Sequence, residues 1–411
     1  MVPTTARPVC DFDVLDRRFY QDPHPAYTWM RANRPIFWDE ANGIWVVSRH
    51  AEVSYVSMHA DLFCSGHGVR PKEGAMLSLI GLDGQRHVSQ RRLLNKGFTP
   101  RMIRTMEPRV RQVVTEVLDE IADRSSCDFV TDIAIPVPLV VIAELMGLPV
   151  EDRVQLGRWS DQMMAGEGRR DPDDPATAAA GAAFGEYVAY LSDMVEERRR
   201  DYRQGRDLPN DAVSVLVGAD EDGLLDSSEE LAHDELTMFL VILLVAGNET
   251  TRNAISGGMW AFDQFPDQWR RLRDHPESFE TMADEITRFV SPVISFSRTA
   301  TQDTELAGQQ IAEGEQVLML YQSANRDEDV FEEPGVLRVD RSPNPHLGFG
   351  VGPHVCMGIN LARLEIRVIF EELIRRFPSM VVAPGVTPVY AEHALVHAVE
   401  SLPVEFTPER G

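Results

Sequence analysis

The chain has 411 residues, of which 43% are hydrophobic and 26% charged, a composition typical of a folded globular protein that excludes intrinsic disorder. The formal net charge of -25 argues against nucleic acid or an anionic membrane as a general partner. The four cysteines are scattered without a framework spacing, so we expect no disulfide scaffold and a cytoplasmic location.

Membrane segments are not expected either. The longest apolar run, residues 238–246, is far too short to cross a bilayer, and the first 14 residues show neither a basic leader nor an apolar stretch. The sequence therefore predicts a protein without a membrane anchor.

In chain order, β-branched stretches at residues 44–48 and 53–57 predict a small sheet near the N-terminus. Apolar residues at helical spacing predict helices over 109–122 and 137–148, and Gly147 closes the second. Residues 165–182 and 220–230 are typical of connections between helices.

A long helix is predicted from residues 228–233 to just before Pro266, with a length of about 50 Å. A strand over 316–321 and a helix from Ile359 to Phe377 follow. Because helical patterns dominate, the fold class is expected to be mainly α with a minor β part.

The segment from Arg86 to Arg111 is basic within an acidic chain. It holds eight Arg or Lys residues and one acid, Glu107, which gives a local charge of +7. Such a segment either receives an acidic partner or is a helical face whose counter-charges lie elsewhere in the fold.

A single cysteine, Cys356, ends a glycine-rich run that starts at His346 and precedes the predicted helix at Ile359. Glycine allows close approach to a flat ligand, and the helix N-terminus favours a thiolate that can ligate a metal. The alternative is a buried cysteine in a tight turn. Pro353 argues against a dinucleotide loop, and zinc would need more Cys or His ligands at close spacing.

The long predicted helix contains Gly247, which costs about 1 kcal/mol relative to alanine, and two polar residues, Glu249 and Thr250, after an apolar run. One interpretation is a local opening of the helix where ligand or water enters and these residues pass protons. The other has Thr250 bonded back to the carbonyl of Ala246 and Glu249 solvated.

Further charged pairs lie at helical spacing. Glu285 and Arg288 are three residues apart, and His87 and Arg91 are four apart, so each pair can share a helical face. Glu285 and Arg288 could form an ordinary surface salt bridge, or the arginine could lock a buried network beneath the cysteine loop. His87 and Arg91, like Arg298, could meet an anion.

The order of these motifs resembles that of the cytochrome P-450 family over essentially the whole chain. His87 and Arg91 come first, then Ala-Gly-x-Glu-Thr, Glu-x-x-Arg, and Phe349-Gly-x-Gly-x-His-x-Cys356-x-Gly358. The resemblance, closest to soluble actinobacterial members, implies a triangular, mainly α fold and a single haem domain over residues 1–411.

The resemblance also implies residue roles. Cys356 would be the axial thiolate on the iron of haem b. Ala246 and Gly247 would line an oxygen-binding notch, Thr250 would hold dioxygen and water, and Glu249 would feed protons. The other implied cofactor-binding residues are His87, Arg91, Arg298, His354, Phe349, Gly350 and Gly358. Glu285, Arg288 and Arg341 would form a structural network, although Leu337-Arg338 stands where relatives have Phe-Asp.

The implied activity is that of a monomeric monooxygenase that uses O2 to hydroxylate a hydrophobic molecule. Electrons would come from NAD(P)H through a separate reductase and an acidic ferredoxin docked on Arg86 to Arg111. An electron-independent haem isomerase or dehydratase, and a haem-binding sensor, are the alternatives.

The substrate is expected to be hydrophobic, possible classes being a sterol side chain, a terpenoid or a branched lipid. This expectation rests on mainly apolar pocket positions taken from the family. These positions are Met76, Leu77, Val241, Val245, Val293, Ile294, Phe296, Leu395 and Val396.

Overall fold

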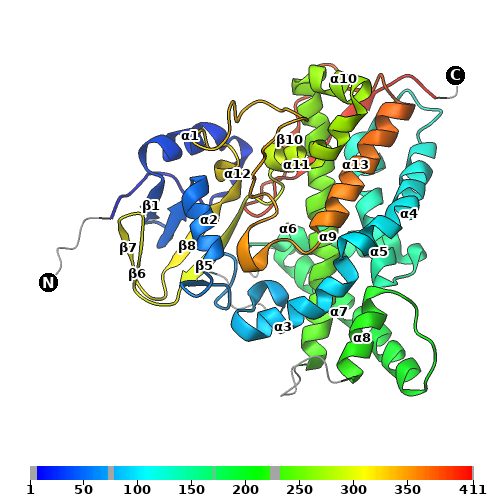
Figure 1. Cartoon of the computed structure of the whole chain (residues 1–411), viewed down its shortest axis with the longest axis horizontal. Coiled ribbons are helices and arrows are strands. Elements are labelled where there is room, and N and C mark those ends of the chain that lie inside the picture. The colour runs from blue at the N-terminus through cyan, green and yellow to red at the C-terminus, as the bar shows by residue number, and fades with distance from the viewer. Residues whose placement is uncertain (1–6, 73–77, 170, 172, 223–231, 410–411) are drawn as a thin grey trace.

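The computed structural model describes residues 7–72, 78–169, 171, 173–222 and 232–409. Figure 1 shows a helical part on the right and a smaller part on the left that holds the main sheet. The fold is therefore mainly α with a minor β part, as predicted. That residues 1–411 form a single domain stays a prediction.

The helices differ widely in length. Their bounds are α1 His24–Asn33, α2 His50–Met58, α3 Gly84–Leu94, α4 Pro100–Asp119, α5 Pro136–Met146, α6 Arg153–Gly166, α7 Pro175–Arg203, α8 Ala212–Glu221, α9 Ala232–Gln264, α10 Pro266–Asp274, α11 Phe279–Val290, α12 Tyr321–Ala324 and α13 Ile359–Arg376. Short 3-10 or π turns connect several of them.

The main sheet has five strands in the order β1-β2-β8-β5-β3. Strand β2 pairs with β8 in parallel, whereas β1 with β2, β5 with β8 and β3 with β5 are antiparallel. The strand bounds are β1 Ile36–Asp39, β2 Ile44–Val47, β3 Phe63–Cys64, β4 Ser126–Asp128, β5 Ser295–Ala300, β6 Thr304–Leu306, β7 Gln309–Ile311, β8 Gln316–Leu320, β9 Val381–Val382, β10 Val389–Tyr390, β11 Val399–Ser401 and β12 Pro403–Glu405.

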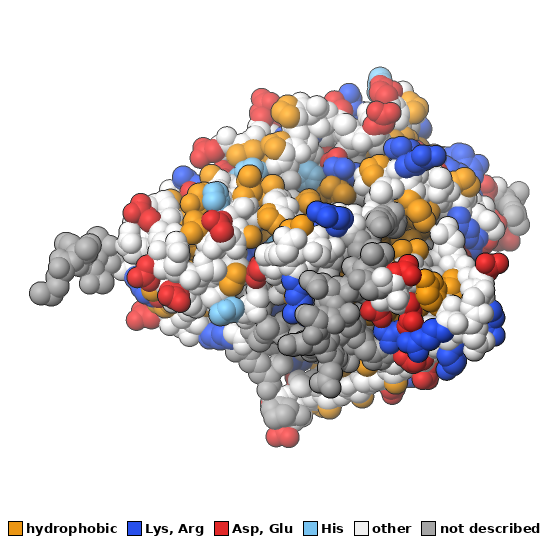
Figure 2. All heavy atoms as spheres, turned by 60° about the horizontal axis from the view of Figure 1, so that its bottom comes forward, with side chains coloured by type: hydrophobic (Ala, Val, Ile, Leu, Met, Phe, Trp, Pro, Cys, Tyr) orange, Lys and Arg blue, Asp and Glu red, His pale blue; other side chains and the backbone are white. Residues whose placement is uncertain are grey.

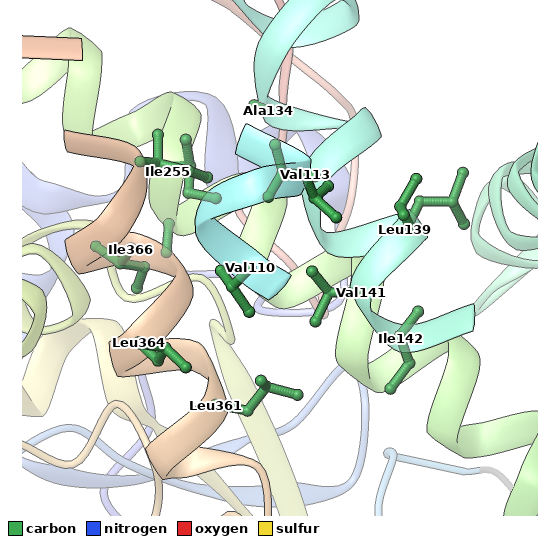
Figure 3. Packing of buried hydrophobic residues seen from close by; sticks show 14 of the residues in the cluster. Val110, Val113, Ala134, Leu139, Val141, Ile142, Ile255, Leu361, Leu364 and Ile366 are labelled. Carbon is green, nitrogen blue, oxygen red and sulfur yellow. The ribbon is translucent and has the colours of Figure 1, made fainter. Parts of the chain in front are cut away.

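Helix α9 runs through the helical part and packs against α5, α6, α7, α11 and α13. Figure 3 shows the core where these helices meet. Val110 on α4, Val141 on α5, Ile255 on α9 and Ile366 on α13 are all buried in one apolar cluster. This packing fixes where α9 and the start of α13 lie, and both elements carry candidate site residues.

Several sequence predictions of elements are confirmed. The long helix is α9, the helix after Cys356 is α13, and the strand near residue 316 is β8. Gly147 ends α5 with a φ of 77°, a left-handed conformation that glycine adopts without strain. None of the helices, within the residues that the structure describes, is long and apolar enough to span a bilayer.

Two predictions of elements are wrong. Residues 53–57 belong to α2, because Val53, Val56 and Ser57 are buried at the spacing of one helical face. Residues 175–182 are the first turns of α7, which Asp174 caps by accepting a hydrogen bond from the Ala176 N–H. Of the predicted loop at 220–230, the first residues end α8, and 223–230 lie outside the described residues.

Candidate functional site

The loop before α13 has a tightly defined backbone. The Cys356 N–H donates to the Phe349 carbonyl at 2.8 Å, and the Gly350 N–H donates to the Leu347 carbonyl at 2.8 Å. Gly352 has a φ of +79°, and a Cβ there would lie 2.7 Å from the Ser57 carbonyl of α2. Only glycine allows this approach, so the glycines fix the loop against α2 and position Cys356.

Cys356 is exposed at the end of this loop. Desolvation raises the pKa of its thiol, while the Gly358 N–H and the charge of Arg91 act to lower it. The N–H at the start of α13 thus acts in the direction predicted for the helix N-terminus, and the thiolate state itself stays a prediction. A Cβ on Gly358 would lie 3.9 Å from the Cys356 sulfur, and the guanidinium carbon of Arg363 lies 5.6 Å from the centre of the Phe349 ring.

Four basic side chains gather beside this loop. The rings of His87 and His354 lie 4.2 Å apart, and Arg91 donates to the carbonyl of Val355, next to Cys356. Arg298 is buried on β5, and both its charge and that of Arg91 act on the two histidines. The structure thus brings together the predicted group from α3, β5 and the cysteine loop.

Few protein carboxylates lie close enough to balance the positive charge of these four side chains. Asp83 lies 3.8 Å from the Nε2 of His354, whereas Arg298 meets only the Ser297 carbonyl among its described contacts. The Nε2 of His87 is buried without a hydrogen-bond partner among the described residues. Burial and the neighbouring His354 lower the pKa of His87 to about 4. A flat ligand with two carboxylates would satisfy these groups, so the residues fit a haem with its propionates.

The middle of α9 presents both accessible and tightly packed positions. Ala246 is exposed although other helices pack around α9, which marks space that protein side chains do not fill. The Thr250 hydroxyl donates to the Ala246 carbonyl at 2.7 Å, and α9 continues unbroken through this segment. The prediction of a local opening in the helix is therefore wrong. A Cβ on Gly247 would lie 2.8 Å from the Ile142 side chain, so Gly247 permits the close packing of α5 on α9.

Glu249 is only 1% exposed, so its interpretation as a solvated residue is also wrong. Its carboxylate accepts a hydrogen bond from the Ser160 hydroxyl at 2.9 Å. The Nη2 of Arg252 lies 2.7 Å from Oε2, an ion pair that is not aligned as a hydrogen bond. Burial outweighs both contacts and raises the pKa of Glu249 to about 7. Ser160 was not predicted, because it lies on a separate helix, α6.

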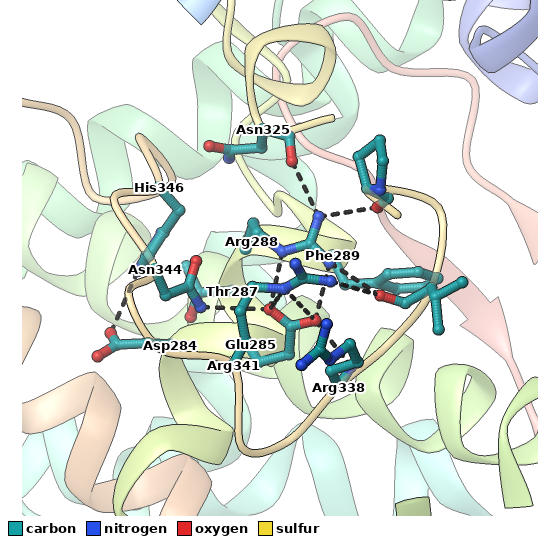
Figure 4. A network of polar contacts seen from close by, with 12 residues as sticks. Asp284, Glu285, Thr287, Arg288, Phe289, Asn325, Arg338, Arg341, Asn344 and His346 are labelled. Atoms are coloured by element: carbon teal, nitrogen blue, oxygen red, sulfur yellow. Dashed lines mark hydrogen bonds and ion pairs between the residues drawn. The ribbon is translucent and has the colours of Figure 1, made fainter. Parts of the chain in front are cut away.

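Glu285 is the centre of the network in Figure 4. Its carboxylate bonds to Arg288 at 2.7 and 2.8 Å and to Arg341 at 3.1 and 3.2 Å. The backbone N–H of Arg338 donates to it at 2.8 Å, so the Leu337-Arg338 departure leaves the three predicted residues together. Asn344 was not predicted and adds a bond at 3.2 Å, which links the network to the chain leading into the cysteine loop.

The predicted pocket residues separate into two groups. Val245, Leu395 and Val396 meet in one apolar cluster, to which Met164 of α6 and Ala398 also belong, and Val293 pairs with Val396. Phe296 packs edge-on against Tyr321. In contrast, Ile294 is fully buried around the main sheet and Val241 is buried in the helical core, so neither joins this cluster. Met76 and Leu77 lie outside the described residues.

Comparisons with known proteins identify the class. A family model described as cytochrome P450 matches residues 278–403. A steroid C26-monooxygenase of Mycolicibacterium smegmatis is 40% identical over 393 residues, covering 90% of this chain and 88% of the relative. One of Mycobacterium tuberculosis is 36% identical, covering 97% and 98%. The chain belongs to the cytochrome P450 family.

Solved structures support the same conclusion. A Mycobacterium marinum cytochrome P450 in complex with pseudoionone has a TM-score of 0.88 and 32% identity, covering 98% of this chain and all of that one. A Bacillus megaterium cytochrome P450 in complex with testosterone has a TM-score of 0.85 and 32% identity, covering 95% and 99%. The fold is the cytochrome P450 fold, and the protein is a P450 monooxygenase of the actinobacterial type, a haem enzyme that uses O2.

Proposed function

We propose that this monooxygenase binds haem b through Cys356 as axial ligand and hydroxylates the side chain of a sterol-like molecule. The observation that carries the haem assignment is the exposed Cys356 beside a basic group in which the buried Nε2 of His87 has no hydrogen-bond partner among the described residues. His87, Arg91, Arg298 and His354 hold the propionates, and Phe349, Gly350 and Gly358 shape the loop. When bound, haem supplies the chemistry that activates O2 and inserts one oxygen atom into a C–H bond.

Glu249 and Thr250 handle protons in this proposal. A carboxyl with a pKa of about 7 is partly protonated near neutral pH, so Glu249 both gives and takes protons readily. The Thr250 hydroxyl donates to the Ala246 carbonyl, which leaves its oxygen lone pairs to accept a hydrogen bond from a water; to hold O2, this hydroxyl would have to turn away from Ala246 and donate to O2. Exposed Ala246 lines the space beside them, and Gly247 contributes through packing rather than as a lining residue.

The substrate class rests on relatives and on the apolar cluster. Relatives with 34% to 40% identity are named steroid C26-monooxygenases. In this chain the cluster of Met164, Val245, Leu395, Val396 and Ala398 joins α6, α9 and the C-terminal segment. Such a lining holds a substrate by burial of apolar surface, with few orienting polar groups.

Electrons come from NAD(P)H through a reductase and an acidic ferredoxin in this proposal, and the protein acts as a cytoplasmic monomer. Part of the basic segment is engaged internally, because Arg111 pairs with Glu371 and Glu372 and Arg109 pairs with Glu144. Arg101 and Arg104 are exposed on α4. Figure 2 shows that basic side chains are more frequent over the helical part, on the right of the view.

A spectral titration of the ferric holoenzyme tests the substrate. A sterol with an intact alkyl side chain, a terpenoid and a fatty acid are added separately, and displacement of water from the iron is recorded. We expect the sterol to give the tightest response and, with reductase and ferredoxin, a product hydroxylated on its side chain. A response to the terpenoid or fatty acid without one to the sterol would refute the sterol assignment.

The haem ligand has its own test. Cys356→Ala should abolish hydroxylation and the thiolate-type spectrum of the reduced carbon monoxide complex. A Cys64→Ala variant is the control, because Cys64 lies on β3 and makes no predicted contact with haem. A thiolate-type spectrum that persists in Cys356→Ala would overturn the assignment.

A further inference from the structure

A polar group is buried between α6 and α9, on the side of α9 that carries Glu249. Ser160 on α6 has no exposed surface, and its hydroxyl accepts from the Asn248 side chain at 3.3 Å while donating to Glu249. The next residue, Asp161, binds the Nη1 of Arg252 at 2.6 Å. Two consecutive residues of α6 therefore hold the Glu249 carboxylate and the arginine that pairs with it.

Few other charges reach this carboxylate. Within the described residues, the charged groups that act on Glu249 are Arg252 on its own helix and Asp161 on α6. Helix α5 packs on α9 at Gly247, and its one charged residue, Glu144, pairs with Arg109. Glu186 of α7 accepts a hydrogen bond from the Trp159 indole N–H, and in the part of the chain that the structure describes no charged group of α11 or α13 is among those acting on Glu249.

The same helix reaches the apolar cluster. Met164 lies four residues after Ser160, so the two share one face of α6, and Met164 packs with Val396 and Ala398. A displacement of α6 by a substrate that fills this cluster would thus change the contacts made by Ser160 and Asp161. Helix α6 thus contacts both the proposed substrate site, through Met164, and the proposed proton donor Glu249, through Ser160.

We propose that Ser160 and Asp161 are positioning residues with opposing effects: Ser160 holds Glu249 in its ionised form, whereas Asp161 shares Arg252 with Glu249, adds a second negative charge nearby and favours the protonated form. The placement of α6 then governs proton delivery. This inference rests on the proposed role of Glu249. A hydroxyl that donates to a carboxylate favours its charge, and a nearby carboxylate disfavours it. The pKa of Glu249, raised chiefly by burial, responds to the two residues with these signs.

The test compares Ser160→Ala and Asp161→Asn in the ferric holoenzyme. The carboxyl band that disappears in Glu249→Gln is titrated by infrared difference spectroscopy, and the pH profile of turnover is measured alongside. Ser160→Ala should move the titration of Glu249 to higher pH, and Asp161→Asn to lower pH, each by about one unit. Ser160→Thr, which keeps the hydroxyl, should return the titration toward that of the unmodified protein.

Glu151→Gln is the matched control, because Glu151 is exposed before α6 and its removal changes the net charge as Asp161→Asn does. It should leave the titration unchanged. Shifts of the same sign in both variants, or no shift in either, would overturn the inference. Asp161 is half-exposed, so Asp161→Asn decides the question if Ser160→Ala fails to fold. A normal turnover in Glu249→Gln would refute the proton role itself, whereas the infrared titration tests the positioning separately.

Discussion

Arg288 and Glu285 form a two-pronged ion pair in which neither side chain has any exposed surface. The remaining guanidinium N–H groups donate to the carbonyls of Asn325, Pro334 and Val336. These bonds offset the cost of taking both charges out of water, and Arg341 adds a second cation on the same carboxylate. The pair therefore anchors the chain that leads to the cysteine loop onto α11.

Glu285→Gln should destabilise the protein by about 3 to 5 kcal/mol, because it leaves two buried arginines without their shared carboxylate. The free energy of unfolding, measured in urea, gives this difference. Asp340→Asn is the control: it breaks the Arg271–Asp340 pair, in which both side chains are 40% exposed, and should cost about 0 to 1 kcal/mol. Equal losses in the two variants would contradict the role of the buried network.

Gly247→Ala tests whether this glycine serves packing or the haem side of α9. The new methyl group would press on Ile142, so the variant should lose about 1 to 3 kcal/mol of unfolding free energy. In an Ile142→Ala background the same change should instead be neutral or gain up to about 1 kcal/mol, because alanine is the better helix former. Urea unfolding of the four proteins gives the coupling.

The activity of that double variant is also informative. We expect Gly247→Ala combined with Ile142→Ala to turn over as fast as Ile142→Ala alone. If Gly247→Ala removed hydroxylation in both backgrounds, glycine would be required beside the oxygen site, as the family resemblance implied.

Arg298→Met should have opposite effects on folding and on haem. The haem-free protein should be as stable as before or more stable, since a buried charge without a protein carboxylate is removed. Haem affinity should fall by about tenfold or more, because one propionate loses its cation. Urea unfolding and haem transfer to an acceptor protein measure the two quantities.

Arg70→Met is the matched control for that variant. Arg70 is equally buried but pairs with Glu167 at 2.8 Å, so its removal should destabilise folding and affect haem transfer little. A stability loss in Arg298→Met as large as that in Arg70→Met would show that Arg298 already has a protein partner.

The sequence predicted those parts of the fold in which local pattern and tertiary packing agree. Helix α9 has a long periodic run, and Pro266 marks its end. Residues 53–57 were predicted wrongly because the short Val-Ser-Tyr-Val-Ser stretch is rich in strand-forming residues, while the burial of Val53 and Val56 follows a helical face. Ser160 and Asp161 could not be predicted, because their importance arises from the crossing of α6 over α9, and no residue pattern within α6 records that crossing.

The basic segment from Arg86 to Arg111 is the surface on which we propose that an electron donor docks. Because Arg109 and Arg111 already pair with internal carboxylates, only exposed residues such as Arg101 and Arg104 are left to attract an acidic ferredoxin. Arg101→Glu and Arg104→Glu should each slow reduction of the haem and weaken its dependence on ionic strength, measured by stopped-flow with the ferredoxin in excess. Arg200→Glu on α7 makes the same change in net charge at another exposed site and should have little effect. Equal slowing by all three variants would mean that the overall charge, rather than this part of α4, attracts the partner.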